Sequence, residues 1–230
     1  MSTAEGGGNI VTDGLILYLD AANTKSIVSG STTWVDISRG GNNGILTNGP
    51  TFNSGNGGNI VFDGVNDFCN LGTSNSTTFP SDFSLNCWVK IFGNVTPFGS
   101  GVISKRNPGT FQSNYQLRFS SSRFTFGING TSPNTVSLSG PLVMLNVWYN
   151  ITCVRIGTIM RIYYNSVLEN TTSTPAGSSS VSNTVLRIGQ NHDLNAPLNG
   201  SIGLTQIYNR ALTAQEVLQN YNATKGRYGL

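Results

Sequence analysis

Acidic side chains are the first candidates for chemistry, because hydrolysis of a glycosidic bond needs two carboxylates facing that bond. Glutamate occurs at three positions only, Glu5, Glu169 and Glu216. The one close acidic pair on strand-like sequence is Asp63 and Asp67, in the string Asp-Gly-Val-Asn-Asp. This spacing favours a structural turn between two strands. A role as metal ligands is the alternative, and the pair does not predict catalysis.

Nucleophilic chemistry finds little support in the sequence. A serine hydrolase needs a histidine base, and His192 is the only histidine. It lies in a polar string, which favours a solvated loop. The chain also has no Gly-x-Ser-x-Gly motif. The three cysteines, Cys69, Cys87 and Cys153, lie in apolar runs and lack Cys-x-x-Cys spacing. They are therefore predicted to be buried free thiols.

Calcium is the cofactor that the sequence leaves open. Calcium takes carboxylate and carbonyl oxygens from loops, and five aspartates could supply them: Asp20, Asp36, Asp63, Asp67 and Asp193. No EF-hand spacing selects among them. In the alternative interpretation, which we favour, these side chains cap turns.

Binding of a sugar would need exposed aromatic rings together with Asn, Asp or Gln groups on loops or on a concave sheet. The candidate ligand-binding residues are Tyr115, Arg118, Gln190, Asn191 and His192, with Phe98 and Phe111 as further aromatic candidates. For each one taken alone, packing at the rim or a place in a turn is the competing interpretation.

Composition bounds the fold that must position these residues. The chain has 230 residues, of which 10% are charged, and a net charge of +3; an average soluble protein has roughly 25% charged residues. Low charge without a clustered basic face argues against a nucleic-acid partner. No apolar run reaches the roughly 18 residues of a membrane span. Residues 1–8 carry neither a basic nor an apolar signal region, so we expect a product made in the host cytoplasm.

Period-two alternation predicts many half-buried strands. Phe83, Leu85, Cys87, Val89 and Ile91 would share one face of the strand over 83–91. Further strands are expected near residues 15–19, 34–37, 60–63, 67–72, 115–119, 124–128, 136–138, 147–156, 160–165, 185–189 and 200–208, and a loop is expected over 171–182.

One helix is predicted, beginning after Thr213. Thr213 and Glu216 have the spacing of a capping box, and Gly226 can end the helix. The fold class is therefore all-β, a two-sheet antiparallel jelly-roll sandwich with one short C-terminal helix. We expect a flexible lead over residues 1–8 and a single domain over 9–230.

Four elements in order resemble the concanavalin A-like, laminin-G-like jelly-roll family. They are Gly14–Asn23; Trp34–Gly44 with Phe62–Phe68; the strand pair Phe83–Ile91 and Trp148–Ile156; and Gly200–Thr213 with its helix. The string Tyr-Asn-Arg-Ala-Leu-Thr at 208–213 is the most specific part. With this string and its many glycine and asparagine residues, the chain also resembles virion proteins of tailed bacteriophages.

The resemblance implies chemistry that this chain in part lacks. The resemblance implies that hydrolases of the superfamily carry the motif Glu-x-Asp-x-x-Glu on one strand. This motif is absent from the sequence, so we expect that the protein is not an enzyme. Several laminin-G-like domains hold one calcium at the rim of the sandwich.

Two functions follow as expectations. The first is a non-enzymatic virion surface protein, namely a capsid decoration, fibre or tail-associated subunit located in the virion. Its partners would be other virion proteins or copies of itself and, through the lectin-like fold, a host-surface glycan; no membrane or nucleic acid is expected. The alternative is a secreted carbohydrate-binding module or lectin with a rim calcium.

Overall fold

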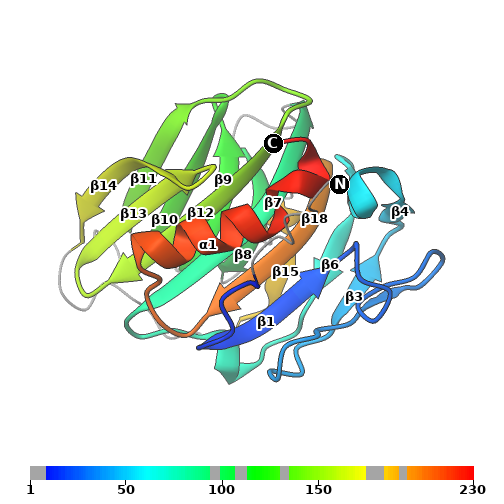
Figure 1. Cartoon of the computed structure of the whole chain (residues 1–230), viewed down its shortest axis with the longest axis horizontal. Coiled ribbons are helices and arrows are strands. Elements are labelled where there is room, and N and C mark those ends of the chain that lie inside the picture. The colour runs from blue at the N-terminus through cyan, green and yellow to red at the C-terminus, as the bar shows by residue number, and fades with distance from the viewer. Residues whose placement is uncertain (1–8, 94–98, 107–112, 130–134, 175–183, 192–195) are drawn as a thin grey trace, which may run out of the picture.

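The computed structural model describes residues 9–93, 99–106, 113–129, 135–174, 184–191 and 196–230. Within these ranges two antiparallel sheets pack face to face, as the sequence predicts (Figure 1). None of the helices in these ranges has the length and apolar character needed to cross a membrane.

The first sheet, called sheet A here, has the strand order β14-β13-β12-β7-β18-β5-β4, and β1 also pairs with β18. Its strands are β1 (Leu15–Asp20), β4 (Thr51–Asn53), β5 (Asn59–Asp63), β7 (Phe83–Gly93), β12 (Trp148–Ile156), β13 (Ile159–Tyr164), β14 (Val167–Ser173) and β18 (Asn199–Tyr208).

The second sheet, sheet B, has the order β11-β10-β9-β8-β15-β6-β3-β2. Its strands are β2 (Thr33–Trp34), β3 (Gly44–Thr47), β6 (Phe68–Asn70), β8 (Ser100–Arg106), β9 (Ser113–Ser120), β10 (Arg123–Asn129), β11 (Thr135–Leu142) and β15 (Leu186–Ile188). A small separate pair joins β16 (Gln190–Asn191) to β17 (Ala196–Pro197). The short 3-10 turns are η1 (Gly55–Gly57), η2 (Asn75–Thr77) and η3 (Lys225–Tyr228).

The core lies between the two sheets and is built from alternate residues of each strand. The predicted inward face of β7 is confirmed, since all five of its apolar residues are at most 1% exposed. Rings of Phe79, Phe83 and Tyr115 pack with centroids 5.1–5.7 Å apart. Cys69, Cys87 and Cys153 are buried free thiols, and burial raises their pKa. They are therefore packing residues.

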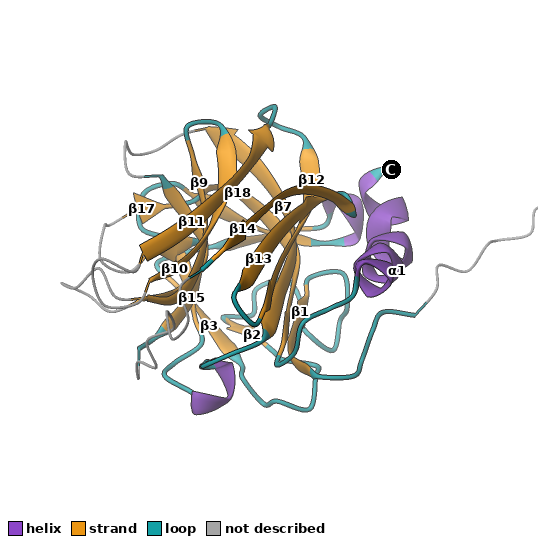
Figure 2. Cartoon of the chain, turned by 90° about the vertical axis from the view of Figure 1, so that its left-hand side faces the viewer, coloured by secondary structure: helices purple, strands orange, loops and turns teal. Residues whose placement is uncertain are grey.

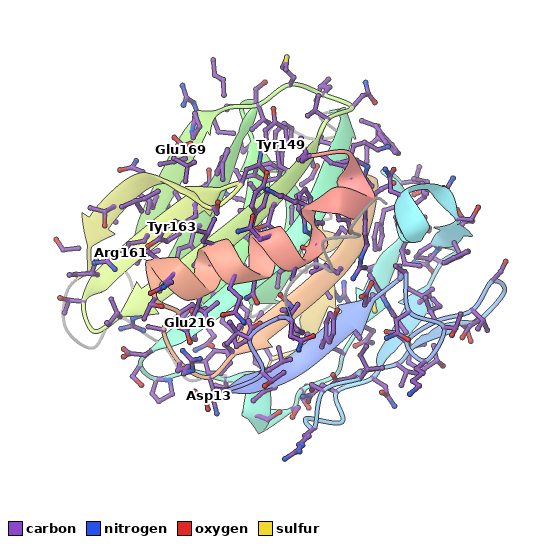
Figure 3. The ribbon with its side chains drawn as sticks, in the orientation of Figure 1. Asp13, Tyr149, Arg161, Tyr163, Glu169 and Glu216 are labelled. Carbon is purple, nitrogen blue, oxygen red and sulfur yellow. The ribbon has the colours of Figure 1, made fainter. Side chains whose placement is uncertain are left out.

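The C-terminal helix covers the outer face of sheet A. It runs over α1 (Ala214–Thr224) and continues into η3, with α1 lying across β12, β7 and β18 (Figure 1). The predicted capping box is confirmed: Glu216 N donates to Thr213 Oγ1, and Thr213 N donates to Glu216. Arg210 joins the helix start by pairing with both Asp13 and Glu216 (Figure 3).

Aromatic stacking holds the C-terminal turn η3 against sheet A. The Trp88 ring stacks on Tyr228 with centroids 4.0 Å apart, and its Nε1 donates to Thr224 Oγ1 at 2.8 Å. Trp148 packs beside them and donates to Asn56. Trp88 thus joins the sheet to the helix rather than lying in the main core.

Two details differ from the sequence expectations. The loop predicted over 171–182 begins inside β14, because residues 171–173 still pair with β13; residues 175–182 lie outside the described ranges. The strand predicted over 34–37 is shorter, since β2 ends at Trp34 and Asp36 instead accepts backbone N–H groups from Tyr18, Ser38 and Asn42.

Replacing Trp88 with alanine should lower the free energy of unfolding by roughly 3–5 kcal/mol, the usual cost of losing a large buried ring. The helix–sheet junction would lose both its stacking and a buried hydrogen bond. Chemical denaturation measures this, with Leu218→Ala, on the exposed side of α1, as the control. A change under about 1 kcal/mol for Trp88→Ala would show that the helix does not depend on this ring.

Lys105 is a fully buried cation in sheet B. Its Nζ donates to Ser74 O and to Thr77 Oγ1, each at 2.9 Å. The described residues give it no carboxylate partner. Burial lowers its pKa to about 8, because a charge removed from water is disfavoured unless it is paired.

The contribution of Lys105 to stability should therefore rise with pH, opposite in sign to that of the buried cysteine thiols, whose pKa values are raised. The unfolded chain holds this proton up to a pKa of about 10.4, while the folded chain releases it near pH 8, so the unfolded state binds more protons between these values. Denaturation of wild type and Lys105→Met between these pH values tests the effect. The unfolding free energy of wild type relative to Lys105→Met should rise across this range, whereas that relative to Lys90→Met should stay constant; parallel pH profiles of all three proteins would contradict the account.

Candidate functional site

The outer face of sheet B carries an ordered row of polar side chains. Arg187 of β15 lies opposite Ser104 of β8, Ser104 opposite Gln116 of β9, and Gln116 opposite Gly127 of β10. Residues paired across neighbouring strands point to the same face. The adjacent row, which includes Ile188, Ile103 and Leu117, points into the core, so these polar residues must point outward.

The strand β16 crosses this face above Gly101. A Cβ at Gly101 would lie 2.2 Å from Asn191 N, so only glycine lets β16 approach β8 this closely. Asn191 accepts from Ser104 Oγ at 3.2 Å and donates to Gln116 Oε1 at 3.4 Å. These three side chains are at most 5% exposed. They form a buried hydrogen-bonded layer beneath the surface.

Two half-buried arginines flank that layer. Arg187 donates to Gln190 Oε1 at 2.5 Å, and its guanidinium lies 4.2 Å from the Phe68 ring centroid. Arg118 lies opposite Gly101 and Thr125, where Thr125 and Ser139 exchange a hydroxyl hydrogen bond of 3.0 Å. The Nε atoms of both arginines are buried, and neither has a partner among the described residues. Burial lowers the pKa of Arg187.

The structure brings together three of the ligand-binding residues predicted from sequence. Arg118, Gln190 and Asn191 all lie on this face, although Gln190 and Asn191 follow Arg118 by some 70 positions in the chain. His192, like Phe98 and Phe111, lies outside the described residues. The sequence did not single out Ser104, Gln116 or Arg187 as binding residues. For Gln116, its alternation with the apolar Leu117 was a signal that it faces outward.

The prediction of Tyr115 as a ligand-binding residue is wrong. Tyr115 lies on the inward face of β9, is 0% exposed and donates its hydroxyl proton to Thr77 O. Because alternate residues of a strand face opposite sides, Tyr115 and Arg118 cannot serve the same surface. The tyrosine is a packing residue of the core.

The acidic pair Asp63 and Asp67 forms a turn. Asp63 N donates to Asp67 Oδ2 at 3.1 Å, and Asp63 Oδ1 accepts from Val65 N. Burial raises the pKa of the Asp67 carboxyl, and its Oδ1 has no hydrogen-bond partner within the described ranges. The turn role, the favoured interpretation of the sequence, accounts for these contacts.

The other aspartates proposed for calcium also serve the fold. Asp20 holds Arg227 with two hydrogen bonds of 2.7 and 3.0 Å, and Asp36 accepts the backbone bonds described above. Asp193 lies outside the described residues. In the part of the chain that the structure describes, no three His, Cys, Asp or Glu side chains come together as a metal site.

A separate groove of about 820 Å³ lies beside β1. The residues that line it include Asp13, Leu15, Tyr18, Ile37 and Arg39. None of the ligand-binding residues predicted from sequence lines it.

The polar face has the chemistry of binding. It offers guanidinium, amide and hydroxyl groups, and no Asp or Glu lies on the described strands of sheet B. A pair of carboxylates for glycoside hydrolysis is therefore missing from these strands. Sheet A is covered by α1 on its own outer side, whereas β10 and β15 of sheet B lie on the opposite side of the molecule (Figure 2).

Solved structures with a similar fold include parts of several larger proteins. The binding domain of Paraclostridial Mosquitocidal Protein 1 has a TM-score of 0.72 and 16% identity, over 91% of this chain and 52% of that one. Domain 4 of AbnA, a GH43 extracellular arabinanase from Geobacillus stearothermophilus solved with arabinotriose, has a TM-score of 0.70 and 16% identity, over 92% of this chain and 100% of that one. Trypanosoma rangeli sialidase matches with a TM-score of 0.69 and 14% identity, over 99% of this chain and 36% of that one.

The chain thus spans about half of the mosquitocidal binding domain and about a third of the sialidase. At these identities the likeness shows the fold alone. No curated protein matches the chain in sequence. Residues 62–218 match the Laminin_G_3 family, and the chain therefore belongs to this family of the concanavalin A-like lectin/glucanases superfamily.

Proposed function

We propose that this chain is a non-enzymatic carbohydrate-binding domain whose ligand lies on the outer face of sheet B. The observation that carries the proposal is the layer of Ser104, Gln116 and Asn191 fixed beneath two half-buried arginines. Prearranged polar groups of this kind give orientation and specificity to a ligand site. The fold shared with an arabinanase domain solved with arabinotriose supports the same function.

Gly127 lets the Gln116 side chain lie across β10, and the exposed part of this face begins at the next strand. Gly127 lies between Gln116 and the exposed Ser137 in the pairing register. A Cβ at Gly127 would lie 3.1 Å from Gln116 Nε2. A bulky side chain at position 137 would therefore fill the open part of the face without entering the core.

Binding to a panel of neutral and acidic oligosaccharides tests the proposal. We expect at least one to bind with a dissociation constant below about 1 mM, and Ser137→Trp to weaken it at least about tenfold. The matched control is Val167→Trp, on the exposed β14 of sheet A, which should bind like wild type. Absence of binding across the panel, or loss of binding in the control alone, would refute the site.

A second function rests on a different surface. Five large apolar side chains exposed in the described ranges lie at the end of β13 where Tyr164 pairs with Val167: Leu142, Met144, Leu145, Val167 and Leu168. Met144 N donates to Tyr149 Oη, and the Tyr149 ring lies 6.2 Å from that of Tyr164. Exposed apolar side chains gathered in one region are typical of protein–protein contact sites. They support the proposal that the domain is also a virion subunit, a capsid decoration, fibre or tail-associated protein, that contacts neighbouring virion proteins or copies of itself.

Co-sedimentation with virus particles, together with light scattering, tests this second function. The double variant Met144→Ser/Val167→Ser should lose particle binding or self-association and stay folded, because both residues are exposed. Val28→Ser/Val65→Ser, exposed elsewhere, is the control. Wild-type protein that stays monomeric and ignores particles would contradict the virion role.

A further inference from the structure

Charge is segregated between the two sheets. The strands of sheet B carry five cationic residues and no acidic one: Lys105, Arg106, Arg118, Arg123 and Arg187. The strands of sheet A carry both signs, with Arg161 and Glu169 on neighbouring strands (Figure 3). In a chain with 13 basic and 10 acidic residues, the outer face of sheet B thus has Arg118, Arg123 and Arg187 without an acidic residue on its described strands.

Most of the five cations are already engaged within the protein. Lys105 points to Ser74 and Thr77 on the inner side, and Arg123 donates to Gly140 O at 2.9 Å. Arg187 is held by Gln190 and by the Phe68 ring. These contacts fix the positive charge in place but leave little of it for a ligand.

Arg118 differs from these three. It is half-buried, and the described residues provide neither an ion pair nor a hydrogen bond for it. Its Nη1 and Nη2 atoms, unlike Nε, are not among the buried atoms of the described residues. An acceptor supplied by a ligand at the surface can therefore reach them. The hydroxyl pair of Thr125 and Ser139 lies alongside it and could receive or donate bonds to sugar hydroxyls.

We propose that the sugar bound on this face is an acidic one, a uronate whose carboxylate pairs with the Arg118 guanidinium while Thr125 and Ser139 contact its hydroxyl groups. This inference rests on the proposed function and names its ligand class. A guanidinium presents two parallel N–H donors that match the two oxygens of a carboxylate. A neutral sugar would leave the arginine unpaired, whereas a carboxylate neutralises it.

The test compares an oligogalacturonate with its fully methyl-esterified form, which has the same backbone and lacks the charge. By calorimetry, the acid should bind at least about tenfold more tightly than the ester, and added salt should weaken the acid alone. Arg118→Gln should remove this preference, and Arg118→Lys should keep part of it. Arg161→Gln, which removes a half-buried arginine from sheet A, is the matched control and should bind like wild type. Thermal unfolding confirms that each variant folds.

The possible failures are distinguishable. Equal binding of acid and ester, unchanged in Arg118→Gln, would overturn the acidic ligand and leave carbohydrate binding standing. Tighter binding of a sulfated oligosaccharide of the same length, or equal binding of polyglutamate, would overturn the uronate assignment, because neither combines a carboxylate with a sugar. Binding of no oligosaccharide at all would refute the proposed function and this inference with it.

Discussion

The pairing register of β15, β8 and β9 is the constraint on which the rest of the structure depends. It aligns Ile188, Ile103 and Leu117 in the core, and the same alignment places Arg187, Ser104 and Gln116 on the outer face. A slip by one residue would move every side chain of a strand to the opposite side. The burial of the core therefore also fixes the polar face, and no separate interaction is needed to assemble it.

The outer face of sheet A is covered by the C-terminal segment, whereas the outer face of sheet B is not, and the difference has a physical reason. On sheet A, Trp88 and Leu204 would leave apolar surface exposed, and the aromatic end of the C-terminal segment, Tyr221 and Tyr228, covers them. The helix that follows the capping box lies over Val154, Tyr208 and their neighbours. Sheet B has no comparable apolar cluster on its outer side among the described residues. Among the described residues, β16 and β17 lie against its outer face, which is polar and therefore suited to hydrophilic ligands.

Local sequence rules predicted much of this fold. Alternation identified β7 and β12, and the Thr213–Glu216 spacing identified the helix start. The missed strand β8 lacks alternation because Val102 forms a bulge between Gly101 and Ile103. Partners distant in sequence, such as Arg187 and Ser104, could not be paired from spacing alone. Tyr115 could have been assigned correctly, since it alternates in phase with Leu117 and Phe119 and out of phase with Arg118.

Ligands should contact sheet B rather than sheet A or the groove beside β1. Chemical-shift mapping of the isotope-labelled protein with a bound oligosaccharide tests this most directly. The account predicts perturbed backbone amide signals in β9, β10 and β15 around Arg118 and Gln116, with the Trp88 and Trp148 indole signals unchanged. Perturbations confined to β13 and β14, or to Tyr18 and Arg39, would contradict it.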